Sequence, residues 1–407
     1  MKILYLFLIL TLFSYEAFAE ETGDVNLGII RQLVTQEFNE EDEKKSELKL
    51  VNFLTNDIIL KDEYQSTNRK NEFKDARAEV RLSSALNFTK KLSINGFFRL
   101  SPSNQDSENT RRNSLPNGGG DRSFENEGLF AEELNFVYNG KKHAFILGKF
   151  NLNFGTAWRF DRGIWSYNIA ENYHQREKLG VGGIYRAGNS KTTGRYEFSY
   201  AVFTNDRKNL DNSTITKRDS SHKSDAAPGD TRSPQSYIGS VDINFDFSKK
   251  EKLSYHFSYI NLAVNEYASQ VSAGKISDQK SFAAGMNYKY PISENLLLDG
   301  LLEYVDVKNF NGNADANQNY LTSNVIAKIY NNWNVTLGYA RQRQAIVAND
   351  SHNKNLTEIS AGYAFENKGF FDKLLLQVGY KNQRDNYKTS IETRSSIGFL
   401  VRYQKEF

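Results

Sequence analysis

The chain has 407 residues, no cysteine and a formal net charge of +3 at neutral pH. The lack of cysteine excludes thiolate catalysis, cysteine-ligated metals and disulfide bonds, and so small a net charge gives no reason to expect a nucleic-acid partner. A chain of this length could form two or three soluble domains, but no linker separates such domains in the sequence.

Residues 1–19 have the pattern of a secretory signal peptide. Met1-Lys2 give a positive start, residues 3–13 are almost wholly apolar, and Ala17-Phe18-Ala19 form a small-x-small cleavage site. The alternative is a membrane anchor, for which the apolar run is short, since a spanning helix needs about 20 residues. We therefore expect cleavage after Ala19.

Residues 20–48 form a separate N-terminal segment with two open interpretations. Apolar residues recur at helical spacing in its first part, at Ile29, Ile30, Leu33, Val34 and Phe38. The charge-dense run EEDEKKSELK follows. One interpretation is a periplasmic helix, a coiled-coil extension or a partial plug; the other is a solvated, partly disordered leader.

From about residue 76 the sequence breaks into short segments that alternate between apolar and polar residues. In the first of these, Ala78, Val80 and Leu82 alternate with Arg77, Glu79 and Arg81. The chain has 23 Tyr and 28 Phe but only 5 Pro, which suits many half-apolar strands in a hydrogen-bonded ladder. Each segment is close to the 9–11 residues of a tilted transmembrane strand.

The connections between these segments alternate in length. The short turns are residues 89–91, 139–142, 248–251, 291–295 and 330–332, and the long polar links are 102–123, 204–235, 266–279, 308–318 and 346–354. Short turns at one end and long links at the other are typical of outer-membrane barrels. Fifteen candidate strands after Ala76, with residues 49–60 added, predict an all-β transmembrane antiparallel barrel of about sixteen strands over residues 49–407. A barrel of this size encloses an aqueous channel.

The last strand, GFLVRYQKEF, ends the chain on an aromatic residue. Its odd positions are mostly apolar or aromatic and its even positions mostly polar. Outer-membrane barrels commonly end in such a strand, which their assembly machinery reads, and this similarity implies that Tyr403 and Phe407 are an assembly signal. Lipid and lipopolysaccharide of the outer membrane of a Gram-negative bacterium are the implied surroundings.

The segment 147–183 is the most distinctive in the chain. It stops alternating near Asn151, resumes near Leu179, and carries two of the three tryptophans. Its large aromatic residues are Trp158, Trp165, Tyr167 and Tyr173. Because an exposed loop would not normally carry so many, we expect residues 151–178 to fold inward with these four side chains as anchors.

This segment resembles a family of alphaproteobacterial outer-membrane porins. The matching pieces are Gly148-Lys149-x-Asn151, Phe154-Gly155, Ala157-Trp158, Gly163-Ile164, Ala170-Glu171-Asn172-Tyr173 and Glu177-Lys178-Leu179-Gly180. The family often has proline after the asparagine, where this chain has Leu152. The resemblance implies a water-filled channel, often trimeric, for the passive diffusion of small hydrophilic solutes and ions.

If the loop lies in the pore, its charges line the constriction. The basic candidates are Lys149, Arg159, Arg162, Arg176 and Lys178, the acidic ones are Asp161, Glu171 and Glu177, and the expected lumen-wall arginines are Arg77, Arg81, Arg99 and Arg195. The basic excess predicts a mild anion preference. The alternative is that Arg159, Asp161, Arg162 and Glu171 pair structurally and leave the constriction nearly neutral.

Two other functional classes are alternatives to a passive channel. His256 alternates with Ser254 and Ser258 on the expected lumen face, so a Ser–His hydrolase on a barrel is conceivable. An adhesin would place large residues in the outer links, which are instead rich in Ser, Asn and Asp. The five histidines show no metal-ligand spacing. We expect no enzyme, metal or cofactor.

Overall fold

The structure is a computed structural model. It describes residues 48–64, 66–67, 72–102, 122–124, 127–159, 162–165, 168–205, 228–265, 276–330, 332–346, 350–365, 372–387 and 390–406. The expected signal peptide and nearly all of the N-terminal segment lie outside these residues. So do Asp161, Tyr167 and Phe407, three of the residues singled out from the sequence.

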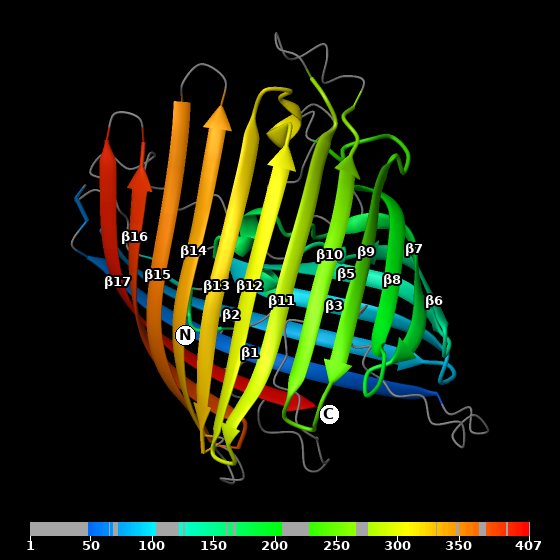
Figure 1. The fold of residues 1–407 in the computed structure, drawn as a ribbon, viewed down its shortest axis with the longest axis horizontal. Coiled ribbons are helices and arrows are strands. Elements are labelled where there is room, and N and C mark those ends of the chain that lie inside the picture. Colours follow the sequence, from blue (N-terminus) through cyan, green and yellow to red (C-terminus); the bar gives the residue numbers. More distant parts are fainter. Residues whose placement is uncertain are drawn as a thin grey trace.

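The described chain forms a closed antiparallel β-barrel of sixteen long strands (Figure 1). These strands are β1 (Lys49–Tyr64), β2 (Phe73–Asn87), β3 (Leu92–Pro102), β5 (Glu127–Asn139), β6 (His143–Phe150), β7 (Lys178–Asn189), β8 (Gly194–Asn205), β9 (Ser236–Asp246), β10 (Lys252–Leu262), β11 (Gln279–Ser293), β12 (Leu296–Lys308), β13 (Asn317–Ile329), β14 (Trp333–Ile346), β15 (Asp350–Phe365), β16 (Leu374–Asn386) and β17 (Ile391–Glu406). The two-residue β4 (Arg122–Ser123) lies parallel to β2. The expected fold class and strand number are confirmed.

The barrel closes where β1 pairs with β17, from Phe53 opposite Glu406 to Tyr64 opposite Ser395. Closure satisfies every strand edge, which a sheet in lipid requires because no water can bond an open edge there. Both β1 and β17 therefore have a hydrogen-bonded neighbour on each side.

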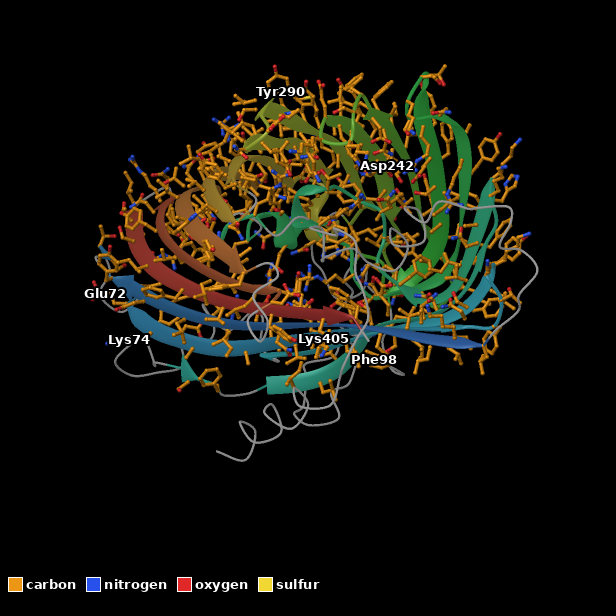
Figure 2. The ribbon with its side chains drawn as sticks, turned by 90° about the horizontal axis from the view of Figure 1, so that it is seen from below. Glu72, Lys74, Phe98, Asp242, Tyr290 and Lys405 are labelled. Carbon is orange, nitrogen blue, oxygen red and sulfur yellow. The ribbon has the colours of Figure 1, made fainter. Side chains whose placement is uncertain are left out.

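Alternation along each strand gives the barrel two chemically different faces. On β17, Ile397 and Phe399 are exposed on the outer face, whereas Ser396 and Arg402 point inward and are buried. Tyr290 projects outward from the ring of strands, and Asp242 lies on its inner side (Figure 2). Alternate residues of each strand therefore face opposite sides of the barrel wall, apolar side chains outward and mostly polar ones inward.

Two predicted connections were wrong. The link expected at 346–354 is mostly strand, since β14 runs to Ile346 and β15 begins at Asp350. The turn expected at 291–295 starts later, because β11 continues through Pro291 to Ser293 with a register shift between them. Strand ends beyond the apolar part of a barrel need no apolar outer face, so their polar residues resemble loops.

Most of the buried apolar residues lie inside the barrel, in one cluster shared by the wall and residues 150–173. The completely buried members of this cluster include Phe154, Trp165 and Ile169. Within the described residues, no helix is long and apolar enough to cross a membrane.

Candidate functional site

The connection between β6 and β7 lies within the barrel (Figure 1). We call residues 151–177 the inner loop; its described residues include two short 3-10 helices, η3 (Ala157–Arg159) and η4 (Ala170–Asn172). It starts along the wall: Asn153 donates from Nδ2 to Asp242 Oδ2 on β9 at 2.7 Å, and the Gly155 amide donates to Ser258 Oγ on β10 at 3.4 Å.

The first part of the inner loop follows a row of neighbouring wall positions. In this row His256 pairs with Asp242 and with Gly285, and Gly285 pairs with Glu303. A Cβ atom on Gly285 would lie 2.7 Å from Thr156 Oγ1. The missing side chain at Gly285 therefore leaves the space that the inner loop occupies.

Two wall carboxylates hold the inner loop by its backbone. Glu303 on β12 accepts hydrogen bonds from the Thr156 and Ala157 amides, from the Thr156 hydroxyl at 2.8 Å and from the Tyr173 hydroxyl. Two successive amides aimed at one anion make a small anion-binding concavity. Since Glu303 is buried, this pairing satisfies a charge that would otherwise be costly.

Glu358 on β15 repeats the arrangement further along the loop. It accepts the amides of Ile164 at 2.5 Å and Trp165 at 3.0 Å. Each pair of donor amides follows a glycine, Gly155 or Gly163, with a φ of +70°. That conformation costs other L-residues roughly 1–2 kcal/mol, which explains why glycine precedes both contacts.

Trp165 fits a notch in the far wall. A Cβ atom on Gly379 of β16 would lie 3.1 Å from its ring, and one on Gly398 of β17 would lie 2.6 Å away. These two glycines face each other across the paired strands. The ammonium group of Lys381 lies 5.6 Å from the ring centroid. The inner loop thus reaches from β6 to the strands that close the barrel.

The other expected anchors also have defined surroundings. Trp158 is 7% exposed, donates from Nε1 to the Phe154 carbonyl at 2.7 Å and stacks on His174 with centroids 3.4 Å apart. Tyr173 is buried against Phe154 and Glu303.

Leu152, which departs from the family pattern, is buried, and its amide donates to the Gln175 carbonyl at 3.0 Å. Proline has no N–H group and could not make this bond. In this chain, a main-chain bond therefore joins the two ends of the inner loop.

Most of the charges expected at the constriction have a partner. Lys149 pairs with Glu177 at 2.9 Å, Arg162 with Asp299 at 2.6 Å, Arg176 with Glu171 at 2.7 Å and Arg159 with Asp242 at 3.8 Å. Lys178 donates to the Asn205 side chain at 2.6 Å. Two of the acidic partners, Asp242 and Asp299, come from the wall, so the basic excess counted within the loop is offset by the strands around it.

The wall arginines have acidic neighbours as well. Arg81 bonds Asp57 at 2.7 Å, Arg99 lies 3.3 Å from Glu79, and Arg195 lies 3.0 Å from Glu197. Arg77 is half-buried on β2 and acts electrostatically on Glu79.

The sequence did not identify the wall carboxylates as partners of these basic groups and of the inner loop. They are Asp57, Glu79 and Glu197 beside the wall arginines, and Asp242, Asp299, Glu303 and Glu358 beside the inner loop. A signal was present in each case, because every one occupies an inward position in its strand's alternation. An acidic residue at such a position is a candidate partner for the inner loop or for the wall arginines.

Burial sets the protonation of two loop residues. It lowers the pKa of His174 well below its usual value, and the nearby Arg176 guanidinium lowers it further. The neutral ring accepts a hydrogen bond from Arg176 Nε at 2.8 Å. Burial raises the pKa of Tyr173 well above its usual value, and Glu303 adds to the rise, so the hydroxyl keeps its proton and donates it.

The serine–histidine pair considered from the sequence does form, with Ser258. His256 Nε2 lies 3.0 Å from Ser258 Oγ, and His256 Nδ1 lies 2.8 Å from Asp242 Oδ1. These distances match a serine, base and orienting carboxylate. However, Ser258 is only 3% exposed, and the Gly155 amide of the inner loop points at its hydroxyl.

No protein-family model matches the sequence, and no curated protein matches it. Solved structures with the same fold include the outer-membrane channel DcaP of Acinetobacter baumannii, with 12% identity, a TM-score of 0.53 and coverage of 88% of this chain and 97% of that one. OmpF of Salmonella typhi, in complex with daunomycin, has 13% identity, a TM-score of 0.52 and coverage of 90% and 99%. The loop L8 deletion mutant of OmpT, an outer membrane protein of Vibrio cholerae, has 8% identity, a TM-score of 0.50 and coverage of 88% and 99%. Identities this low establish the barrel fold alone.

Proposed function

We propose that the protein is an outer-membrane porin, a passive channel for small hydrophilic solutes and ions. The observation that carries this proposal is the inner loop, held across the lumen by Glu303 and Glu358 and by Trp165 in its glycine notch. A sixteen-stranded barrel is wide enough for an aqueous channel, and a segment fixed in this way would narrow that channel. The similarity to DcaP and OmpF structures supports the barrel on which the proposal rests.

The pore constriction in this proposal is formed by the loop charges and the wall arginines. Its residues are Lys149, Arg159, Asp161, Arg162, Glu171, Arg176, Glu177 and Lys178, with Arg77, Arg81, Arg99 and Arg195 on the wall. The mild anion preference stays a prediction, and the pairing of Arg159 and Arg162 with wall aspartates argues that it is weak. In a ring of charges, selectivity follows the net charge at the narrowest point.

The location and assembly of the protein are part of the same proposal. The short turns face the periplasm and the long links face outward, as in other outer-membrane barrels. Residues 1–19 direct secretion, the C-terminal strand with Tyr403 and Phe407 addresses the barrel assembly machinery, and three copies associate in the membrane. Chemical cross-linking in native outer membranes tests the trimer, which would give a ladder ending at three copies.

A liposome-swelling assay tests the channel directly. Vesicles containing the folded protein should swell in sugars at rates that fall steeply as the sugar becomes larger. Equal rates for protein-free and protein-containing vesicles, with the barrel shown to be folded by its heat-modifiable migration in electrophoresis, would exclude an open channel.

The chain Asp242–His256–Ser258 makes a hydrolase the second candidate function. The argument against a hydrolase is that the inner loop covers Ser258. An acyl group would have to displace Gly155 to reach the Ser258 hydroxyl. A fluorophosphonate probe distinguishes the two functions. Labelling of the wild type but not of Ser258→Ala would support a hydrolase, and no labelling of either is what a passive channel predicts.

A further inference from the structure

Four consecutive short turns at one end of the barrel carry exposed lysines. These turns join β2 to β3, β5 to β6, β7 to β8 and β9 to β10. We call their lysines, together with the first residue of β10, the basic arc; they are Lys90, Lys91, Lys141, Lys142, Lys191, Lys249, Lys250 and Lys252, and all are exposed except the half-buried Lys91. The next two short turns, residues 294–295 and 330–332, contain no lysine. Positive charge is therefore concentrated on one side of this end of the barrel.

Few carboxylates offset the basic arc. Glu251 is the single acidic residue in the four turns, and it accepts the Tyr288 hydroxyl at 2.7 Å. Asp246, at the end of β9, lies 3.9 Å from Lys252. Lys250 donates to the main-chain carbonyl of Glu294 at 2.9 Å, which carries no net charge. The ammonium groups thus outnumber the carboxylates beside them, and their combined potential attracts an acidic chain.

The chain that enters β1 from this end is acidic. Residues 20–47 contain nine acidic and three basic residues. We call residues 37–47 the acidic run, because they hold six of these acidic residues: Glu37, Glu40, Glu41, Asp42, Glu43 and Glu47. Lys49 begins β1 and pairs with Asn87, the last residue of β2. The acidic run therefore ends beside the first turn of the basic arc.

The acidic run is long enough to follow the basic arc. An extended chain spans about 3.3 Å per residue, so the acidic run can cover roughly 35 Å. Neighbouring strands lie about 4.8 Å apart, and their tilt widens this spacing to about 6 Å around the rim. The turn between β7 and β8 lies beyond β2, β3, β5, β6 and β7, which places it roughly 30 Å from β1 along the rim. The acidic run can therefore reach the first three turns of the arc.

We propose that the acidic run binds the basic arc of its own chain and so lies along the rim of the barrel at the short-turn end. The covalent link to β1 holds the acidic run at a high effective concentration beside the arc, which favours this occupant over a separate acidic partner. Each exposed pair of a carboxylate and a lysine contributes little alone, so several pairs act together. Because these pairs are exposed, salt weakens their combined attraction.

The test places a photo-cross-linker in the acidic run of the full chain, folded in detergent micelles. Asn39→Cys supplies a single thiol, since the natural chain has no cysteine, and this thiol carries a benzophenone label. Mass spectrometry then locates the cross-linked residues. Lys373 is the internal reference. It is exposed and precedes β16, two strands from β1 on the other side, so it is nearer to the acidic run than residues 140–142 and 190–193 are.

We expect cross-links to residues 140–142 and 190–193 to exceed those to Lys373 at least fivefold. About 1 M salt should abolish this excess. The arc variant, Lys141→Gln/Lys142→Gln/Lys191→Gln, should abolish it as well. The matched control, Lys74→Gln/Lys280→Gln/Lys308→Gln, removes the same charge from exposed positions at the long-link end and should keep the excess.

Equal cross-linking of the basic arc and Lys373 would overturn the proposal, and so would an excess that survives in the arc variant. Cross-links to inward-facing wall residues would indicate a plug in the lumen and overturn it too. Cross-links between copies would mean that the acidic run binds a neighbouring molecule, which also contradicts the proposal. Because the readout is a position and not a current, the result is independent of the proposed channel.

Discussion

The carboxylate of Glu358 accepts a hydrogen bond of 2.5 Å from the amide of Ile164, a residue 194 positions away in the sequence. The bond joins β15 to a loop that leaves the barrel wall at β6. With the equivalent contacts at Glu303, it fixes the inner loop at two points along its length. The position of the loop should therefore depend on a few wall residues that lie far from it in sequence.

Gly163→Ala should displace the inner loop. The new methyl group would overlap Glu358 Oε1, and the φ of +70° adds a backbone cost of roughly 1–2 kcal/mol. We expect altered single-channel conductance and faster trypsin cleavage within residues 151–177. Gly239→Ala is the matched control, since nothing lies within 4 Å of the position of its Cβ atom. Wild-type behaviour of both variants would contradict the docking at Glu358.

Gly398→Ala should expel Trp165 from its notch, because the added Cβ atom would lie 2.6 Å from the indole ring. Moving a buried tryptophan toward water shifts its fluorescence emission to longer wavelength. The measurement is made in a Trp158→Phe/Trp333→Phe background, where Trp165 is the remaining tryptophan. An unchanged emission maximum would mean that the ring does not contact Gly398.

A disulfide should form between Thr156→Cys and Gly285→Cys. The Gly285 Cβ position is 2.7 Å from Thr156 Oγ1, so two introduced sulfur atoms come within bonding reach after small shifts. The natural chain has no cysteine to compete. Mass spectrometry of the oxidised protein should show one intramolecular bond with conductance retained. The pair Thr156→Cys/Gly239→Cys should stay reduced, and a bond there instead would contradict the structure.

Arg159→Ala/Arg162→Ala should lower the anion-to-cation permeability ratio measured from the reversal potential in a salt gradient. The change leaves Asp242 and Asp299 without their arginines and makes the constriction more negative. Arg162→Ala/Asp299→Ala removes one charge of each sign, so its ratio should stay near that of the wild type. An unchanged reversal potential in the first variant would exclude a role for these arginines in selectivity.

His174→Phe should reduce the acid sensitivity of the folded barrel. Burial holds the pKa of His174 below its usual value near 6.5. The unfolded chain therefore binds a proton below about pH 6.5 that the folded chain does not, and stability falls as the pH falls. Phenylalanine keeps the stacking on Trp158 and has no proton to gain. Urea unfolding in micelles should show that the free energy of unfolding falls less between pH 7.5 and pH 5.5 in the variant than in the wild type. An equal fall in both proteins would contradict a lowered pKa of His174 as a cause of the acid sensitivity.

The barrel could be predicted from the sequence because its signal is local. Apolar and polar residues alternate at every second position, proline is scarce, and turns recur at regular intervals. These features specify the strands and their two faces without knowledge of distant contacts. The prediction of a link at 346–354 was wrong for a physical reason. The strands at this end of the barrel are polar on both faces, so their periodicity does not distinguish them from loops.

The details of the inner loop could be predicted only in part. Its aromatic content suggested burial, and Trp158 and Trp165 are buried. Its partners depend on which wall positions share a row, and the register of strands more than a hundred residues away sets this. Glu303 and Glu358 were therefore overlooked, and the charges of the loop were counted without the wall aspartates that pair with them.

The most direct test of the account compares the single-channel conductance of the wild type with that of Glu303→Leu/Glu358→Leu in planar bilayers. The variant leaves four main-chain amides without their acceptors and should release the inner loop. We predict stable conductance steps for the wild type and an altered, noisier conductance for the variant. A folded wild-type barrel that does not conduct, or a variant with the same steps, would contradict a channel narrowed by the inner loop.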